Sequence, residues 1–473
     1  MKRTLRCLLA AALLALGALP AAGGEPRSAL AAIGVEDIHL RPAFWVARLA
    51  APDQVLMDSA AIAAQNAELF ARDSSMNDLS RLPATLSRRA VAARIEDLSA
   101  PPSGTLYDAG GTPVERATLD ALVQNRNLDA IPARQATRFG LVVRRAALRT
   151  FPTDLRVFRS PEDHDIDRFQ ESALFPGTPV VIAHASRDGR WLFVIAPRYA
   201  AWVEKDRVAE GERDTVLAYG RKSPYRIVTG GNVETVFTPE RPAVSRLALD
   251  MGVRIPVLED WPADEPVNGQ HPYTAHVIEL PVRETDGRLA LAPALLPKVA
   301  DSAGDYLPVT RANVVRQAFR FLGERYGWGH SYGARDCSGF VSEVYRSMGV
   351  MLPRNTSDQG VSPAFDKRLF DAADSRAERL VALRSLDVGH LVYIPGHVMM
   401  VVGTVDGEPW VIHDTTGFGH VAPDGTFTRV RLNGVSITPL IALAANETEL
   451  YIDRMTSIVR VVPAPAKEAP PPL

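Results

Sequence analysis

The spacing of apolar residues divides the chain into three regions of different character. Between about 42 and 100, apolar side chains such as Ile62, Leu69 and Phe70 recur at helical spacing, which predicts short helices. Between about 140 and 300, short β-rich runs alternate with glycine and proline turn signals, which predicts small all-β barrels. From Asp305 onward, helical and strand patterns are mixed, which predicts an α+β domain.

The mixed region begins with two predicted helices and continues with strands. Thr310 can cap a first helix with an apolar face, and Gly323 follows its end. A second helix opens at about Cys337 and stops before Gly349. A hairpin turn is expected at Asp406–Gly407. The strand candidates are Leu391–Ile394, His397–Gly403 and Trp410–His413.

Both ends of the chain lie outside this pattern. Three basic residues precede an apolar run from Cys7 to Leu19, and small residues follow it. This is the layout of a secretory signal peptide, and the run is shorter than the roughly 20 residues that a membrane-spanning helix needs. A buried N-terminal helix is the alternative. We expect residues 1–23 to be removed and the mature protein to be periplasmic or secreted, with no membrane span. The proline-rich residues 463–473 are expected to be disordered.

Composition and cysteine usage narrow the function. The 473 residues carry a formal net charge of -2, without the basic surplus expected of a nucleic-acid-binding protein. The chain has two cysteines, Cys7 and Cys337, and removal of the signal peptide would leave one. A lone thiol in an exported protein cannot form an internal disulfide. Composition alone leaves it equally interpretable as a catalyst or as a small buried hydrophobe.

The surroundings of Cys337 favour the catalytic interpretation. The stretch YGWGHSYGARDCSG at 326–339 places a glycine-rich loop directly before the helix that Cys337 opens. Free backbone N–H groups and the positive end of the helix dipole favour a thiolate, so we expect the pKa of this thiol to fall. The same N–H groups can hold an oxyanion.

A base for this nucleophile must come from another element. His397 follows a proline and a glycine at the start of an apolar strand, a position from which its side chain can project into a cleft. His413 near the end of the next strand, or its neighbour Asp414, could orient the imidazole. A histidine on an apolar strand is more often a core residue, which is the alternative. The sequence lacks the HExxH spacing of a helical zinc site, so we expect neither a metal nor another cofactor.

At this point the residues match a known family. The region from about Tyr306 to His413 closely resembles the NlpC-type cell-wall cysteine peptidases, papain-like enzymes that cut peptidoglycan stem peptides. The resemblance implies that Cys337 is the nucleophile, His397 the base and His413 the third residue. The matching stretches, in order, are YGWG at 326–329, RDCSGF at 335–340, LPRN at 352–355, Gln359, PGHVMMVVG at 395–403 and VIHDTTG at 411–417.

Three further residues receive roles by the same resemblance. Tyr326 corresponds to a tyrosine close to the oxyanion region. Asp336 and Ser338, which flank the nucleophile, correspond to residues that face the free amine of the stem's N-terminal alanine. The chain departs from the family pattern at His330, where a second glycine usually follows the tryptophan, and this leaves the local loop conformation open.

Weaker matches extend the resemblance to a subgroup with bacterial SH3-like barrels. They include LRTFPTD at 148–154, GRWLFV at 189–194 and AWV at 201–203. The resemblance implies a multidomain α+β chain that ends in a papain-like α+β catalytic domain. Its expected parts are a signal peptide at 1–23, a helical stabilising segment at 24–135, all-β SH3-like barrels at 136–225 and 226–304, an NlpC-type peptidase domain at 305–462 and a tail at 463–473.

The implied function is hydrolysis of the bond between γ-D-glutamate and the third-position diamino acid, such as diaminopimelate, in a stem peptide or muropeptide. Relatives with a barrel over the cleft tend to require a free N-terminal L-alanine. Two alternatives stay open: an amidase or acyltransferase on the same papain-like core, and a wall-binding protein with little activity. We expect a monomer with no nucleic-acid partner.

Overall fold

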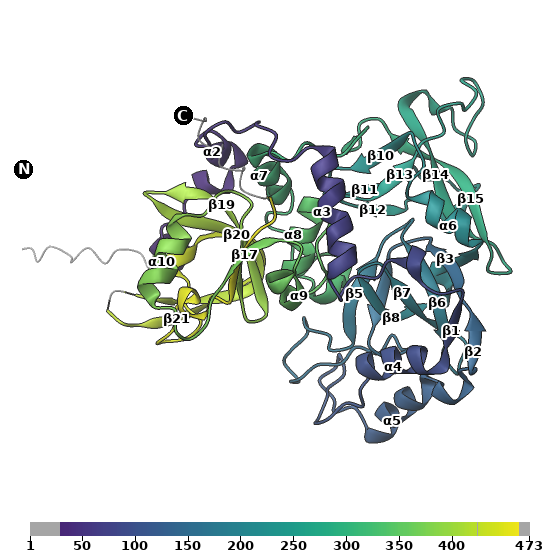
Figure 1. Cartoon of the computed structure of the whole chain (residues 1–473), viewed down its shortest axis with the longest axis horizontal. Coiled ribbons are helices and arrows are strands. Elements are labelled where there is room, and N and C mark those ends of the chain that lie inside the picture. Colours follow the sequence, from purple (N-terminus) through teal and green to yellow (C-terminus); the bar gives the residue numbers. More distant parts are fainter. Residues whose placement is uncertain (1–28, 423, 463–473) are drawn as a thin grey trace, which may run out of the picture.

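The computed structural model describes residues 29–422 and 424–462. The expected signal peptide and proline-rich tail, at 1–23 and 463–473, lie outside this part. The C-terminal α+β domain lies on one side of the molecule and two β-rich units lie on the other, with helix α3 between them (Figure 1). Among the described residues, no helix is both long enough and apolar enough to cross a membrane.

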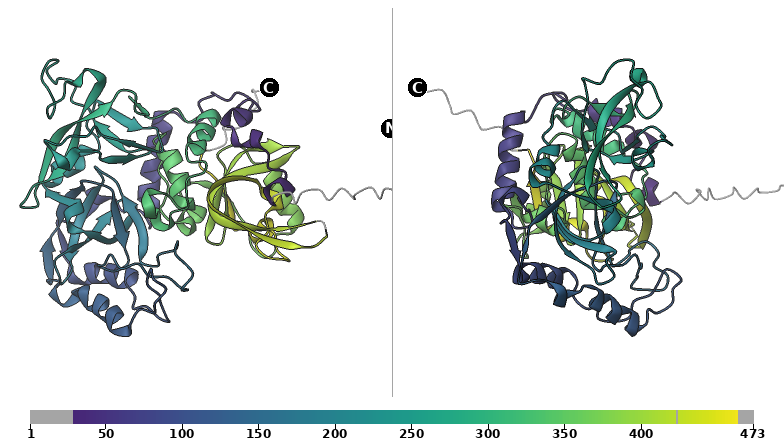
Figure 2. Two further views of the ribbon diagram at one scale, coloured as in Figure 1. Left: turned by 180° about the vertical axis from the view of Figure 1, so that it is seen from behind. Right: turned by 90° about the vertical axis from the view of Figure 1, so that its right-hand side faces the viewer.

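The N-terminal segment is helical and contacts both halves of the molecule. Asp58 caps α3, because its carboxylate accepts a hydrogen bond from the Ala61 N–H at 2.8 Å. Helix α3 runs along one side of the molecule, and α4 and α5 lie at the end of the first β unit (Figure 2). The elements are α1 (Ala29–Ala32), α2 (Pro42–Val46), α3 (Ser59–Arg72), β1 (Thr85–Ser87), α4 (Arg88–Leu98), α5 (Arg116–Asn125) and β2 (Arg134–Ala136).

The first β unit is one antiparallel sheet in the order β5-β4-β8-β7-β6-β3-β9. Its core contains Phe193 and Trp202, both fully buried, and α4 covers one side of it through Val91 and Ile95. The strands are β3 (Arg138–Val142), β4 (Ala146–Arg149), β5 (Gln170–Leu174), β6 (Pro179–Ala185), β7 (Trp191–Ala196), β8 (Tyr199–Glu204) and β9 (Val208–Gly211), and α6 (Arg213–Tyr219) follows.

The second β unit consists of small antiparallel sheets around one apolar core that includes Ile255, Ile278 and Leu296. Its strands form one three-stranded sheet and two two-stranded sheets, so a second SH3-like barrel stays a prediction. The strands are β10 (Tyr225–Val228), β11 (Asn232–Glu234), β12 (Ala248–Asp250), β13 (Arg254–Pro256), β14 (Ala275–Arg283), β15 (Leu289–Pro297) and β16 (Ser302–Ala303).

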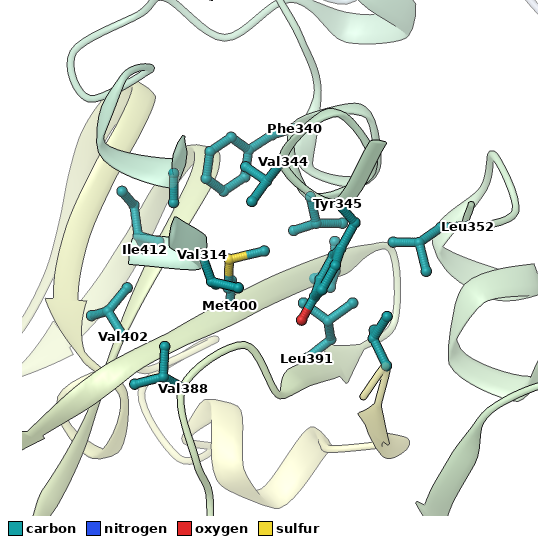
Figure 3. Close-up of a cluster of buried hydrophobic side chains, with 14 of the residues drawn as sticks. Val314, Phe340, Val344, Tyr345, Leu352, Val388, Leu391, Met400, Val402 and Ile412 are labelled. Atoms are coloured by element: carbon teal, nitrogen blue, oxygen red, sulfur yellow. The ribbon is translucent and has the colours of Figure 1, made fainter. Parts of the chain in front are cut away.

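The C-terminal domain is a six-stranded sheet in the order β17-β22-β18-β19-β20-β21, with α7 and α8 packed on one face. Figure 3 shows Phe340, Val344 and Tyr345 of α8 above the strand residues Leu391 and Met400. The elements are α7 (Arg311–Phe319), α8 (Cys337–Arg346), α9 (Thr356–Val361), β17 (Asp366–Leu369), α10 (Arg376–Arg384), β18 (Leu391–Ile394), β19 (His397–Val405), β20 (Glu408–Val421), β21 (Phe427–Pro439) and β22 (Ser457–Arg460).

The predicted helices and the hairpin turn of this domain are confirmed. Thr310 caps α7 by accepting from the Asn313 N–H at 3.0 Å, and α8 opens at Cys337. Asp406 and Gly407 both have positive φ, 51° and 79°, as a type I′ turn requires. The strand predicted at Trp410–His413 is too short. Pairing with β21, for which no strand was predicted, extends β20 to 14 residues.

Candidate active site

Cys337 is the first residue of α8, and Asp336 is the N-cap. The Asp336 carboxylate accepts from the Gly339 N–H at 2.8 Å, which fixes the first turn of the helix. The Cys337 side chain packs into the core of the domain and is only 5% exposed. The structure therefore holds the sulfur at the helix start, where the backbone N–H groups of Cys337 and Ser338 have no partner within the helix.

The expected fall in the pKa of this thiol is wrong for the described structure. Burial raises the pKa of Cys337 to about 12, and the neighbouring carboxylates of Asp336 and Asp414 act in the same direction. The Val398 N–H, which lies beside the sulfur, only partly offsets them. Burial and the Asp336 carboxylate therefore favour the neutral thiol, and a neutral thiol needs a base before it can attack.

The structure brings the two predicted histidines together on neighbouring strands. His397 Nε2 lies 2.8 Å from His413 Nδ1, and His413 Nε2 lies 3.1 Å from the Thr438 hydroxyl oxygen. Burial lowers the pKa of His397 to about 4 and that of His413 well below its usual value, so both rings are neutral near pH 7. When His397 Nε2 carries its proton and donates it to His413, Nδ1 of His397 is left to act as the base.

The sulfur and the base lie on adjoining elements and are not yet bonded. The Val398 N–H reaches the sulfur, which places Cys337 against the start of β19, where His397 lies. Within 29–422 and 424–462, no hydrogen bond joins the thiol to the imidazole. Such bonds are often long in a ligand-free enzyme and tighten when substrate binds.

Asp414, the alternative orienting residue, makes no hydrogen bond to His397 in the described part of the chain. It is fully buried, and neither carboxylate oxygen has a hydrogen-bond partner in the described part of the chain. Burial raises its pKa well above the usual value, and the carboxylates of Asp336 and Glu324 add to this effect. The orienting contact to the base is therefore made by His413, and Asp414 lies on the side of Cys337 and Tyr326.

A cleft of about 590 Å³ leads to this pair and contains Tyr326, Trp328 and His397 among its lining residues. Tyr326 is 6% exposed, and burial together with the nearby Cys337 and Asp336 raises its pKa well above the usual value. The structure thus places the predicted oxyanion-region tyrosine beside the nucleophile, as a neutral phenol.

One wall of the cleft comes from the first β unit. The segment 163–166, between β4 and β5, lines the cleft. Asp165 holds it in place through ion pairs to Arg325 and, at 2.5 Å, to Arg431. Both arginines belong to the C-terminal domain, so this segment narrows the approach to His397.

Asp336 and Ser338 lie in a buried network with Arg354, which the sequence did not single out. Arg354 Nη2 donates to Asp336 Oδ2 at 2.7 Å, and Nη1 donates to the Ser338 hydroxyl at 2.8 Å. The Gly329 N–H also donates to Asp336 Oδ2, at 3.0 Å. Burial alone would raise the pKa of Asp336, but the Arg354 guanidinium and His330 lower it to about 2. Both carboxylate oxygens already have partners, so Asp336 offers little to an incoming amine.

His330 completes this network and explains the departure from the usual glycine. Its φ is 64°, and its ring nitrogens lie 3.0 Å from Arg354 Nη2 and 3.1 Å from Glu343 Oε1. Burial lowers its pKa to about 4, and the Arg354 guanidinium contributes. The LPRN stretch contains Arg354, but the sequence does not reveal the hydrogen-bond partners of this side chain. They depend on the conformation of the loop that holds His330.

In the part of the chain that the structure describes, no group of three or more His, Cys, Asp or Glu side chains is arranged to hold a metal ion.

Two family models match parts of this chain. Residues 323–428 match the model of the NlpC/P60 family, and residues 156–204 match that of an SH3 domain of the SH3b1 type. No match was found among curated proteins.

One solved structure has a similar fold over most of the chain. An NlpC/P60 endopeptidase from Photobacterium damselae subsp. piscicida has a TM-score of 0.71 and 17% identity, covering 88% of this chain and 96% of that one. An NlpC/P60 family protein from Bacillus cereus has a TM-score of 0.44 and 18% identity, covering 69% of this chain and 100% of that one.

The predicted mixed α+β class, with an SH3 domain ahead of a C-terminal NlpC/P60 domain, is confirmed at that level. The family role of the helical segment and the second barrel stay predictions. Residues 323–428 of this chain form a domain of the NlpC/P60 family, and it is joined to an SH3 domain of the SH3b1 type.

Proposed function

We propose that this protein is a cell-wall hydrolase, a cysteine endopeptidase that cleaves the amide bond between γ-D-glutamate and the diamino acid of peptidoglycan stem peptides. NlpC/P60 is a family of cysteine peptidases that act on peptidoglycan. The observation that carries the proposal is the arrangement of Cys337 at the start of α8 against β19, where His413 orients His397.

The first half of the reaction forms a thioester. Because the thiol is neutral, its proton moves to Nδ1 of His397 as the sulfur attacks the γ-carbonyl carbon. The carbonyl oxygen becomes an oxyanion, which the free N–H groups at the start of α8 stabilise. His397 then donates the proton to the leaving amine, the C–N bond breaks, and an acyl-enzyme remains.

The second half regenerates the enzyme. His397 is neutral again and takes a proton from water as the water attacks the thioester. Collapse of this intermediate releases the γ-carboxyl group, and the sulfur regains its proton from the imidazole. The bond from His397 Nε2 to His413 holds the ring in one orientation throughout both halves, so that the proton is exchanged at Nδ1.

We also propose a preference for stems with a free N-terminal L-alanine, and action in the periplasm or outside the cell. The first β unit contacts the acyl side of the site, where Arg354 Nε donates to the Ser172 hydroxyl at 2.6 Å and Arg198 Nη2 donates to the Ser342 hydroxyl at 2.8 Å. Since Asp336 is already paired, closure by this unit supports the preference better than recognition by Asp336 does. The basic and apolar layout of residues 1–23 supports export.

Mass spectrometry of products from defined stem peptides tests the proposal. The wild type is expected to release L-Ala-D-Glu from L-Ala-γ-D-Glu-diaminopimelate, and Cys337→Ala to release nothing. Release of the intact peptide from its muramoyl group would instead identify an amidase. Equal cleavage of muramoyl-capped and free stems would contradict the preference for a free L-alanine.

A further inference from the structure

One end of the cleft carries two arginines that the proposed reaction does not use. Arg429 on β21 and Arg454, the last residue of the turn Tyr451–Arg454, line the cleft together with His397. Across the described ranges, neither guanidinium has an ion pair or a hydrogen bond. Arg431, two residues further along β21, differs because it is paired with Asp165 at 2.5 Å.

Both arginines lie near Tyr451, whose ring packs against His397. The Tyr451 ring is edge-on to His397, with 6.5 Å between ring centroids. Burial raises the pKa of the Tyr451 phenol, and Arg429 and Arg454 both act against this rise, as positive charges near its hydroxyl group do. Two positive charges therefore lie near Tyr451, in the cleft that His397 also lines.

The direction of proton transfer indicates which part of the substrate lies beside Arg429 and Arg454. His397 must protonate the leaving amine, so the residue that carries this amine lies on the His397 side of the nucleophile. The acyl side is the region of Ser338 and Arg354, where the first β unit closes the site. The segment with Asp163 and Asp165 forms a separate wall, and Asp165 is already neutralised by its two arginines.

We propose that Arg429 and Arg454 form a binding site for a carboxylate of the leaving residue. The inference rests on the proposed function and names the substrate class within it: a leaving amino acid with a free carboxylate, as diaminopimelate has. Guanidinium groups pair with carboxylates through charge-assisted, often bidentate hydrogen bonds. The carboxylate is the distal group of the diamino acid or its α-carboxylate, and amidation of each group separates the two sources.

Steady-state kinetics on four tripeptides tests this site. The substrates are L-Ala-γ-D-Glu-diaminopimelate and its distal, α- and doubly amidated forms. For the wild type, amidation of the recognised carboxylate is expected to raise KM about tenfold, the equivalent of one lost charge-assisted contact at an exposed site. The effect is expected to fall on KM rather than on kcat, because the contact exists before and during the reaction.

Charge removal from the protein gives the matching experiment. Arg429→Gln and Arg454→Gln are each expected to raise KM for the free acid and not for the doubly amidated peptide. Arg89→Gln on α4 is the control, because Arg89 is exposed and lies outside the cleft lining. The wild-type advantage of the free acid should shrink as salt rises from about 0.05 to 0.5 M, since exposed ion pairs are screened.

The outcomes separate the two proposals. Equal wild-type KM values for the free and doubly amidated peptides would overturn the carboxylate site and leave the endopeptidase proposal standing. The same holds if both arginine variants lose the free and amidated substrates alike. If the wild type cleaves none of the four peptides, the proposed function fails and the inference falls with it.

Discussion

Cys337 and His397 are both uncharged at rest, which makes proton transfer part of the attack itself. The thiol has its pKa raised to about 12 and the imidazole has its pKa lowered to about 4, so a resting thiolate–imidazolium pair is not the stable state near pH 7. A neutral pair of this kind depends on how well the base is oriented. The bond between His397 and His413 is therefore central to the site.

The pH dependence of alkylation of the free enzyme reports the protonation state of the Cys337 thiol. The rate with iodoacetamide is expected to rise about tenfold per pH unit between pH 7 and 9, because only the thiolate reacts and its pKa lies above that range. The Cys337→Ala variant is the blank. A rate that is already constant at pH 6–8 would mean that the thiolate is pre-formed and that burial does not dominate.

Replacement of His413 should weaken the base without removing it. His413→Ala is expected to lower kcat about 10²–10⁴-fold and to leave residual turnover, because His413 orients the imidazole and does not exchange protons with substrate. Asp414→Asn is the matched comparison, since Asp414 makes no bond to His397, and it should have the smaller effect. Equal losses in both variants would place Asp414 in the machinery as well.

At the scale of elements, the first turn of α8 is held by buried charge pairs. Arg354 bonds both Asp336 and Ser338, and it reaches Ser172 on β5. One side chain therefore ties the nucleophile helix to the first β unit.

Loss of this arginine should destabilise the fold. Arg354→Met is expected to lower the free energy of unfolding by about 3–5 kcal/mol, because Asp336 would be left buried and unpaired. The control is Arg384→Met on α10, whose pair with Glu408 is exposed on both sides. Urea unfolding followed by circular dichroism compares them. A change in Arg354→Met no larger than in the control would mean that water replaces the lost pair.

The elements around the site could largely be predicted, and the network could not. Thr310, Cys337 and the turn at Asp406 follow local rules of capping and turn geometry, which short stretches of sequence carry. The length of β20 depends on pairing with β21 across a long turn, and a period of two does not reveal it. The partner of Arg354 depends on a loop whose His330 has a positive φ.

At the scale of the whole molecule, the C-terminal domain is held by hydrogen bonds to the second β unit and to helix α3. Arg335 of the C-terminal domain donates to the Gly231 carbonyl at 2.6 Å and to Asp250 at 3.0 Å, both in the second β unit. Asn66 and Gln65 of α3 donate to the carbonyl oxygens of Gly349 and Val461. These contacts join residues up to 396 positions apart, so no local pattern in the sequence predicts them.

The ion pairs that hold Asp165 at the cleft are expected to limit the size of the substrate. Asp165→Ala is expected to free the segment 163–166 and to raise the relative rate on stems that extend beyond the diamino acid several-fold, because the ion pairs to Arg325 and Arg431 are lost. The ratio of kcat/KM for extended and short stems is the measurement. Glu162→Ala is the control, because Glu162 is exposed and lies outside the cleft lining. An unchanged ratio would mean that another element limits access.

The strand order of the C-terminal sheet has a consequence for folding during synthesis of the chain. Strand β22 lies between β17 and β18, so residues 457–460 form the second strand from one edge of the C-terminal sheet. During synthesis the nucleophile and both histidines leave the ribosome before this strand does. Until it arrives, β17 has no partner and β18 has only one. A nascent or truncated chain therefore carries Cys337, His397 and His413 before the sheet is complete, and β17 joins the sheet only when β22 has been made.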